Sequence, residues 1–552
     1  IPMYVKLTKS KDHTYVQIVE SYRDHNGVPR HRVLFNLGRL DLLKQDFSFA
    51  KVLEKLLSII NESSESKCNI EYQNISEAEI VNWGYKIYEK LWKKFGLDEV
   101  LSDIQKETRV KFNLKDSCFL MTIEHLLSPK SKLGVYNNRN RYFNFPDVDL
   151  HHLYRSLDVL SKYKDRLEEE LFYKNLNVFN MVVDVVFYDV TTFSFESVKR
   201  DSLREFGYSK DGKFNEVQVV MGLLINGEGR PIGYELFPGN TFEGKTLELM
   251  LDKLKKRFNI GRVIIVADRG INNKLNLKSI KDKGFDYIVA SRIKSLPEGI
   301  KSEVFSEEGF KILSDSEEEL FKYKVLNYDN IVKDPDGREI ILSENLIISY
   351  SSKRASKDKA DRERLISKAY NLLSSNSIES SFKRGGRKYI KRADNAQGET
   401  SYSLDEALIE KDSLFDGYYG IQTSDKSMSA LEIIEAYHNL WRVEESFRIM
   451  KSNLEVRPIF HWTEERIKGH FVICFLAFLL ERTLEYKLKQ SGESYSADRI
   501  RNSINGMNFA VFSAEGEEYC MKTKIDELGN SILKALKIKP PKNISKKNQI
   551  NF

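Results

Sequence analysis

"VVDVVFYDVTTFSF", residues 182–195, is a run of β-branched and aromatic residues interrupted by two aspartates. Such a run predicts a strand that is largely buried. Asp189 lies inside the run, where a charge is costly unless it is paired or binds a cation. The alternative is an aspartate that only caps a turn at the end of the strand. Asp184 and Glu196 are rivals, but each lies an odd number of residues from Asp189 and is expected on the other face of the strand.

The segments that follow predict an α/β core. Two β-type runs at 216–225 and 230–237 precede a helix at 245–257, the strand "RVIIVAD" at 262–268, a helix at 274–284 and a strand at 285–292. The later strands are almost wholly apolar, which is typical of a sheet that is covered on both faces.

Asp268 ends "RVIIVAD", at the carboxyl end of a strand that we expect near the centre of the sheet. Open α/β sheets place their sites at that end, although an aspartate there also serves as a helix N-cap. Two strand carboxylates, joined by a third from a later helix, provide the oxygen ligands that a pair of Mg²⁺ ions requires. Such a pair activates an attacking water or hydroxyl and stabilises the leaving oxygen of a phosphodiester.

"WRVEESFRIMK", residues 441–451, offers two candidates for the third acid, Glu444 and Glu445. Neighbours on a helix point about 100° apart, so at most one of them faces a site formed elsewhere. Glu444 shares a helix face with Tyr437, Arg448 and Lys451, which favours it slightly. A surface ion pair with Arg448 would explain either glutamate equally well, so the spacing alone does not decide which of them is the third acid.

The periodicity along the chain predicts six regions. They are an N-terminal β-hairpin unit at 1–45, a helical domain and candidate DNA-binding domain at 46–181, the first part of the core at 182–299, an insertion subdomain at 300–414, the second part of the core at 415–490, and a C-terminal helical region with a basic, disordered tail at 491–552.

The composition excludes several classes of protein. The chain has 552 residues, 41% of them hydrophobic and 11% aromatic, which is typical of a folded protein rather than a disordered one. The longest apolar run, at 471–480, is about half the length that spans a bilayer, so no membrane partner is expected. The four cysteines show no CxxC or Cys/His ligand spacing, which favours a reduced, cytosolic setting.

These motifs, in this order, resemble the DDE transposases of bacterial insertion sequences, specifically the IS-four-like branch with a β-rich insertion before the catalytic Glu. The resemblance covers about 185 to 485 and is carried by "YDVTTFSFE", "FPGNTFEGKTL", "VADRGI", "DGYYGIQTS" and the stretch from "YHNLWRVEESFRIMK" to "FVICFLAFLLER". That branch has a Tyr-x2-Arg-x3-Glu-x6-Lys signature. Tyr437 and Lys451 match its ends if the acid is Glu444, and this match selects Glu444, although Leu440 stands at the Arg position.

The resemblance implies a ribonuclease H-like mixed sheet with a β-rich insertion, and a metal-dependent enzyme that cuts DNA at transposon ends and transfers the strand into target DNA. Asp189, Asp268 and Glu444 would hold two Mg²⁺ ions, for which Mn²⁺ substitutes. Its partners would be double-stranded DNA, as transposon ends and target, and a second copy of itself in a homodimer or larger synaptic assembly. We expect a bacterial cytoplasmic protein that joins the nucleoid when active.

The resemblance also suggests which residues contact DNA. Tyr437, Arg448 and Lys451 would hold the end DNA, and Arg442 or Arg448 would replace the missing signature arginine. The basic stretch of the insertion is a further candidate surface, with Lys383, Arg384, Arg387 and Lys388.

Two other functions remain open from the residues. A ribonuclease H-like nuclease without strand transfer uses the same metal chemistry, and only the joining of DNA to a new target separates the two. A non-catalytic DNA-binding protein, whose acids are structural, would leave DNA intact in the presence of Mg²⁺ or Mn²⁺.

Overall fold

The computed structural model describes residues 3–10, 12–23, 28–45, 51, 78–209, 212–213, 215–260, 263–268, 270–316, 319–333, 336–374, 385–394, 400–514, 517–550 and 552. The chain forms two compact units. One contains Ile1–Met181, Phe195–Val198 and Ser446–Phe552, and the other contains Val182–Ser194 and Lys199–Glu445. The second unit, which holds the large sheet, is called the sheet unit below, and the first is called the helical unit.

The sheet unit is built on a nine-stranded mixed sheet with the order β10-β11-β12-β15-β9-β8-β5-β6-β7. Its five core strands are β5 (Val185–Ser194), β6 (Gln218–Asn226), β7 (Pro231–Pro238), β8 (Ile264–Ala267) and β9 (Asp286–Ala290). β5, β6 and β7 pair antiparallel, whereas β8 and β9 run parallel to β5. This is the strand order of a ribonuclease H-like fold, so the predicted α/β fold class is confirmed.

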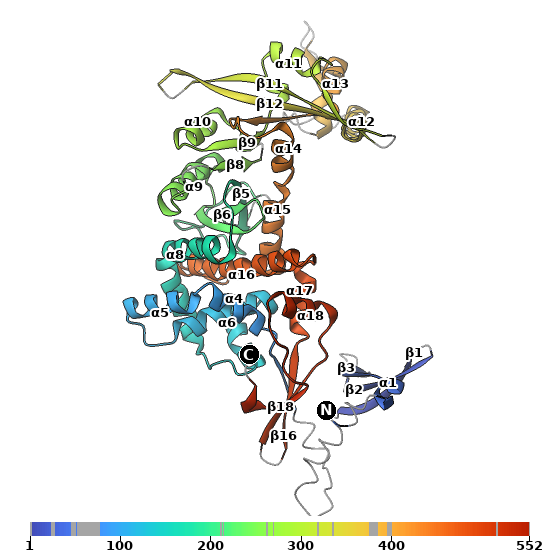
Figure 1. Ribbon diagram of the computed structural model, residues 1–552. Helices are drawn as coiled ribbons and strands as arrows, with labels where there is room; N and C mark the ends of the chain where they lie inside the picture. The colour runs from blue at the N-terminus through green and yellow to red at the C-terminus, as the bar shows by residue number, and fades with distance from the viewer. Residues whose placement is uncertain are drawn as a thin grey trace, which may run out of the picture. The chain divides into compact units, whose positions relative to one another are not determined.

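Helices cover both faces of this sheet (Figure 1). α9 (Glu243–Arg257) and α10 (Lys274–Asp282) connect β7 to β8 and β8 to β9, and they pack against each other. α14 (Ala430–His438) packs on β8, β9 and β15. The strands between these layers are almost wholly buried, which explains why they are nearly all apolar in sequence.

The segment between β9 and β15 widens the same sheet. Its elements are η2 (Ile293–Ser295), α11 (Glu298–Phe305), β10 (Lys311–Asp315), β11 (Leu320–Lys333), β12 (Glu339–Ser351), α12 (Ser352–Ser374), η3 (Gly385–Tyr389), β13 (Ile390–Asp394), β14 (Thr400–Leu404) and α13 (Glu406–Ser413). β12 pairs with β15 (Tyr418–Thr423), which in turn pairs with β9. The β-rich insertion is therefore hydrogen-bonded into the core sheet.

The helical unit surrounds one long apolar helix, α16. Its helices are α4 (Lys86–Lys94), α5 (Leu97–Thr108), α6 (Leu114–Leu127), α7 (Lys132–Asn138), η1 (Arg139–Arg141), α8 (Leu150–Phe179), α16 (Glu464–Gln490), α17 (Ala497–Asn505) and α18 (Glu527–Ala535). The run at 471–480 is buried within α16 against α6 and α8. No helix in the described ranges is both long enough and apolar enough to cross a bilayer.

The N-terminal residues form a small sheet of three strands, β1 (Met3–Ser10), β2 (His13–Arg23) and β3 (Pro29–Arg39), followed by α1 (Leu40–Gln45). The hairpin predicted from the sequence corresponds to β2 and β3, and β1 adds a strand that the sequence pattern did not reveal.

The C-terminal tail contradicts the expectation of disorder. Within the helical unit, β4 (Glu79–Asn82), β16 (Asn508–Ala514), β17 (Glu517–Lys522) and β18 (Ile544–Lys546) form a four-stranded sheet, and η5 (Lys547–Gln549) follows. The ring of Phe552 stacks on Trp83, with centroids 5.4 Å apart. The tail is ordered because these strand pairings satisfy its backbone and its last aromatic ring stacks on a buried tryptophan.

Candidate active site

Asp189 and Asp268 lie side by side on neighbouring parallel strands. Tyr188 on β5 is the register partner of Ala267 on β8, and each aspartate is the next residue along its strand. Paired positions on parallel strands point to the same face, and the strands lie about 4.8 Å apart. Both aspartates are half-buried. Residues 79 apart in sequence are thus brought together by the core of the sheet.

The face that carries the two aspartates is the one under α14. The Tyr188 hydroxyl donates to Thr246 Oγ1 of α9 at 2.7 Å, so Tyr188 points toward α9 and Asp189 points away from it. On the far side of β8, Ile421 of β15 is the register partner of Ala290. Tyr419 points to the same face as Ile421, because it lies two residues earlier.

Tyr437 of α14 lies near this face and near Glu444, the candidate third acid. Its ring lies 5.7 Å from that of Tyr419. Burial raises the pKa of the Tyr437 hydroxyl far above its ordinary value, and the hydrogen bond with Tyr419 and the negative charges of Asp268 and Glu444 raise it further. Tyr437 is therefore within electrostatic reach of both carboxylates, while Glu444 is exposed and Glu445 is half-buried.

The helix that carries Glu444 is interrupted, whereas the helix face shared by Tyr437 and Glu444 in the sequence analysis requires a continuous helix. α14 ends at His438, α15 spans Trp441–Arg448, and a π-helical turn, η4, spans Ile449–Asn453. Between α14 and α15 the backbone amides of Leu440 and Val443 donate to carbonyls three residues earlier, which tightens the chain locally. Leu440 is buried, which explains why an apolar residue is tolerated where the family signature has arginine.

Arg442 anchors α15 to the sheet unit. Its Nη1 donates to the carbonyl oxygen of Gly227, in the turn between β6 and β7, at 2.6 Å, and its Nε donates to Asn439 Oδ1 at 3.2 Å. This arginine, predicted as a replacement for the signature Arg, thus has partners inside the protein. Arg448 is exposed and Lys451 half-buried, and both belong to the helical unit.

The basic residues predicted in the insertion differ in their environments. Lys388 forms an ion pair with Asp412, which also accepts from the Tyr389 hydroxyl at 3.0 Å. The pKa of the Asp412 carboxyl is lowered: burial raises it, but hydrogen bonds from Lys294, Lys388 and Tyr389 lower it by more. Arg387 is half-buried. Lys383 and Arg384 lie outside the described residues.

A cavity of about 300 Å³ adjoins the carboxylate face, and no pattern in the sequence predicted it. It is lined by residues that include Ala290, Tyr419 and Arg354, and the Arg354 guanidinium lies 4.5 Å from the centroid of the Tyr419 ring. Tyr419 therefore contacts both the cavity and Tyr437. The motif "DGYYGIQTS" carries Tyr419, so the resemblance alone could have drawn attention to it.

The two aspartates fit a divalent cation of the Mg²⁺ class. Asp189 Oδ1 accepts the amide of Val190 at 2.7 Å, and Asp268 Oδ1 accepts the amide of Gly270 at 2.8 Å. These bonds hold the orientation of both carboxylates on one face, which supplies the all-oxygen donor set that hard cations prefer. A bound cation would offset the mutual repulsion of two half-buried charges of like sign.

Comparison with known proteins identifies the class. Residues 183–480 match the family described as the transposase DDE domain, and because the match covers more than half of the chain, the chain belongs to this family. It is therefore a DDE transposase, a polynucleotidyl transferase and endonuclease that acts on DNA and depends on divalent metal ions.

A second family match covers the N-terminal residues. Residues 5–66 match the N-terminal domain of IS1634 family transposases, so the chain is a transposase of an insertion sequence. A cryo-EM structure of the piggyBac transposase synaptic complex with hairpin DNA aligns with 8% identity over 77% of this chain and 80% of that chain, with a TM-score of 0.36. No match was found among proteins with curated descriptions.

Proposed function

We propose that Asp189, Asp268 and Glu444 are the catalytic carboxylates, and that they hold two Mg²⁺ ions, with Mn²⁺ as a substitute. The observation that carries the proposal is the register of β5 and β8, which aligns Tyr188 with Ala267 and so sets the aspartates next to each other. Glu444 is preferred over Glu445 because Tyr437 and Lys451 match the ends of the family signature only with Glu444, and the negative charges of Asp268 and Glu444 both raise the pKa of Tyr437.

Residues of the chain orient the proposed carboxylates for the reaction. When bound, the metal ions supply the Lewis acidity that activates the attacking oxygen and stabilises the leaving one. The backbone amides of Val190 and Gly270 orient the two aspartates. Arg442 is a positioning residue, because its bond to the Gly227 carbonyl fixes α15, which carries Glu444, to the sheet unit. Tyr437 stays protonated and acts as a hydrogen-bond donor.

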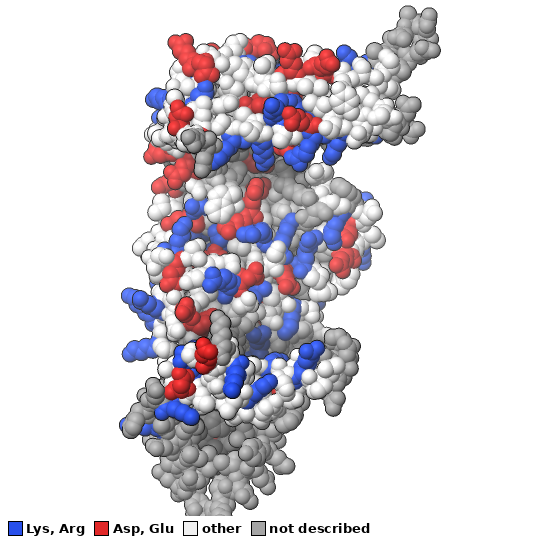
Figure 2. Space-filling view, turned by 90° about the vertical axis from the view of Figure 1, so that its right-hand side faces the viewer, with Lys and Arg blue, Asp and Glu red and all other residues white. Residues whose placement is uncertain are grey.

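The DNA contacts are proposed from charge and exposure. Tyr437, Arg448 and Lys451 are assigned to the transposon end, as the family signature implies. α12 is the better candidate for the insertion surface, since Lys357, Lys359 and Lys368 are exposed and make no ion pair with other described residues. In the space-filling view, Lys and Arg side chains line the lower edge of the part that holds β11, β12 and α12 (Figure 2).

Two copies of the chain are proposed to pair two transposon ends in a homodimer or larger synaptic assembly, and the active protein is proposed to sit on the nucleoid. Coordinated cutting of two ends requires one carboxylate set for each end. The proposed Lys and Arg contacts would make end binding weaken steeply as salt is raised.

The test is cleavage and joining with DNA that carries the element's own ends and flanks. With Mg²⁺, Asp189→Asn and Asp268→Asn should each lower the cleavage rate by more than about a hundredfold. Asp184→Asn is the matched control, because Asp184 is exposed and precedes β5. Equal activity of all three variants would refute the assignment.

The same assay distinguishes a transposase from a nuclease without strand transfer. A pre-cut end with a free 3′-hydroxyl should become joined to a target plasmid in the presence of the wild-type protein and Mg²⁺. Cutting without any joined product would favour a nuclease. Binding of DNA that stays intact would favour a non-catalytic DNA-binding protein.

A further inference from the structure

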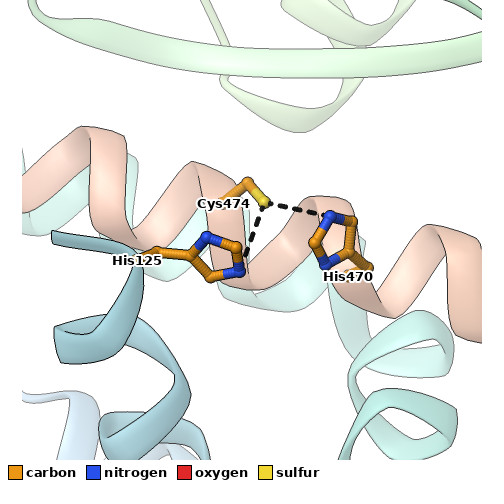
Figure 3. Close-up of side chains that lie close together, drawn as sticks. All are labelled: His125, His470 and Cys474. Carbon is orange, nitrogen blue, oxygen red and sulfur yellow. Dashed lines mark hydrogen bonds between the residues drawn. The ribbon is translucent and has the colours of Figure 1, made fainter. Parts of the chain in front are cut away.

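A second group of side chains that could bind a metal lies inside the helical unit. Its ligand atoms are nitrogen and sulfur, whereas those of the carboxylates are oxygen. His125 of α6 and His470 and Cys474 of α16 are all buried, and their nearest ligand atoms lie within 4.8 Å of one another. Cys474 Sγ is 3.6 Å from His470 Nε2 and 4.0 Å from His125 Nε2, and Figure 3 shows both rings directed at the sulfur.

The surroundings of the two imidazoles match those of metal-binding histidines. His125 Nδ1 lies 2.9 Å from the carbonyl oxygen of Leu454, which leaves Nε2 on the side of the sulfur. In His470 the nitrogen that lies nearest the sulfur, Nε2, also lies 3.0 Å from the carbonyl oxygen of Val456, so Nδ1 is the nitrogen that is left to bind a metal. A backbone carbonyl on the second nitrogen is the usual outer partner of a metal-binding histidine. His470 Nδ1 is buried and has no hydrogen-bond partner among the described residues.

A cavity of about 200 Å³ gives access to this cluster and offers a fourth ligand. Its lining includes His125, His470 and His461, and the His461 ring lies 5.3 Å from the ring of His470. His461 is 5% exposed. If the His461 side chain turns toward the cluster, it completes a four-coordinate site. If it stays where it is, a water molecule fills the fourth position.

Lys132 is the competing occupant of this space. Its Nζ lies 3.5 Å from His125 Nε2, and its side chain lines the same cavity. An ammonium group there donates to the imidazole and repels a cation, so a metal ion can enter only when the lysine side chain swings into the cavity or gives up its proton.

We propose that His125, His470 and Cys474, completed by His461 or water, bind one transition-metal ion of the Zn²⁺ class. The two nitrogens and one sulfur suit a borderline-soft ion and do not suit Mg²⁺, which prefers oxygen ligands. Binding replaces the thiol proton of Cys474 with the metal, and the proton leaves to solvent.

Such an ion would tie three segments of the helical unit together. α6 supplies His125, α16 supplies His470 and Cys474, and the segment after η4 supplies His461 and the carbonyls of Leu454 and Val456. That segment continues the chain directly from α15, which carries Glu444. The role is structural and does not depend on the carboxylate assignment.

The test uses the full chain, stripped with a chelator, desalted and titrated with Co²⁺, which reports thiolate ligation by a charge-transfer band and tetrahedral geometry by intense visible bands. We expect saturation at one ion per chain, competition by Zn²⁺ and not by Mg²⁺, and loss of the charge-transfer band in Cys474→Ser. Cys118→Ser is the matched control, because Cys118 is also buried in the helical unit but lies outside the cluster.

Lys132→Met supplies a variant that does not depend on removing a ligand. It removes the competing ammonium, and we expect it to tighten Co²⁺ binding by roughly tenfold. Failure of the stripped wild-type protein and of Lys132→Met to bind Co²⁺ or Zn²⁺ would overturn the proposal. So would a charge-transfer band that persists in a folded Cys474→Ser protein.

Discussion

Glu344 is a carboxyl group held inside the core sheet, on the face opposite Asp189 and Asp268. It is fully buried on β12 and accepts hydrogen bonds from Tyr287, Gln422 and Asn330. Burial raises its pKa from 4.5 to about 7, although the three hydrogen bonds act in the opposite direction. The fold therefore favours the protonated acid.

This raised pKa predicts a pH-dependent stability. The contribution of Glu344 is fully present below pH 4.5, is lost as pH rises from there to about 7, and stays constant above that. The loss amounts to about 3 kcal/mol. Glu344→Gln should remove this part of the pH dependence, as measured by denaturant unfolding at about pH 5 and about pH 8. An unchanged difference between the two pH values would contradict the prediction.

Arg442 is predicted to act on the site by holding α15. Arg442→Met keeps the length of the side chain but loses the bonds to Gly227 and Asn439, which should lower stability by about 1.5–3 kcal/mol. DNA cleavage should fall as well, because Glu444 loses its fixed position. Thermal unfolding and the cleavage rate are the measurements, with Arg442→Lys as the control that retains one donor. Loss of cleavage with unchanged stability would indicate a direct contact with DNA instead.

At the scale of elements, the crossing of α16 and α8 depends on one glycine. A Cβ atom on Gly469 would lie 2.1 Å from the backbone oxygen of Leu157, a contact that only movement of a helix could relieve. Gly469→Ala should therefore destabilise the helical unit by about 1–3 kcal/mol.

The matched control for that substitution is Gly299 in α11, where an added Cβ has nothing within 4 Å. Gly299→Ala should be neutral or stabilising by up to about 1 kcal/mol. Thermal unfolding of both variants decides the point, and equal stability of Gly469→Ala and the wild type would show that the two helices pack less closely than described.

Local sequence patterns were sufficient to predict the two strands that lead to the aspartates. The apolar run around Asp189 and the run ending at Asp268 gave the central strands, because buried parallel strands are apolar along their whole length. The break between α14 and α15 was missed, since no proline or glycine marks it and the tightened turn follows from the burial of Leu440.

Long-range pairing was beyond the reach of the sequence. β4 pairs with β16, more than four hundred residues later, and each strand is too short to be predicted from its own sequence pattern. The metal-ligand cluster was missed for the same reason. His470 and Cys474 are four apart on one helix, but His125 joins them only through the packing of α6 on α16.

At the scale of the whole molecule, the proposed site combines two carboxylates aligned by the core sheet with a third on a later helix. The family and the fold class followed from motifs that keep their order along the chain, whereas the assignment of individual residues rests on register and on the electrostatic link through Tyr437. The adjacent pair Glu444 and Glu445 requires both kinds of reasoning, because one is the proposed metal ligand and the other is its neighbour on the same helix.

The most direct test is metal-dependent cleavage of labelled DNA bearing the element's ends by Glu444→Gln and Glu445→Gln. Loss of cutting in Glu444→Gln alone, with DNA binding retained, is the predicted result. Loss in Glu445→Gln alone would mean that α15 presents the other acid to the site, and undiminished cutting by both variants would contradict the three-carboxylate site.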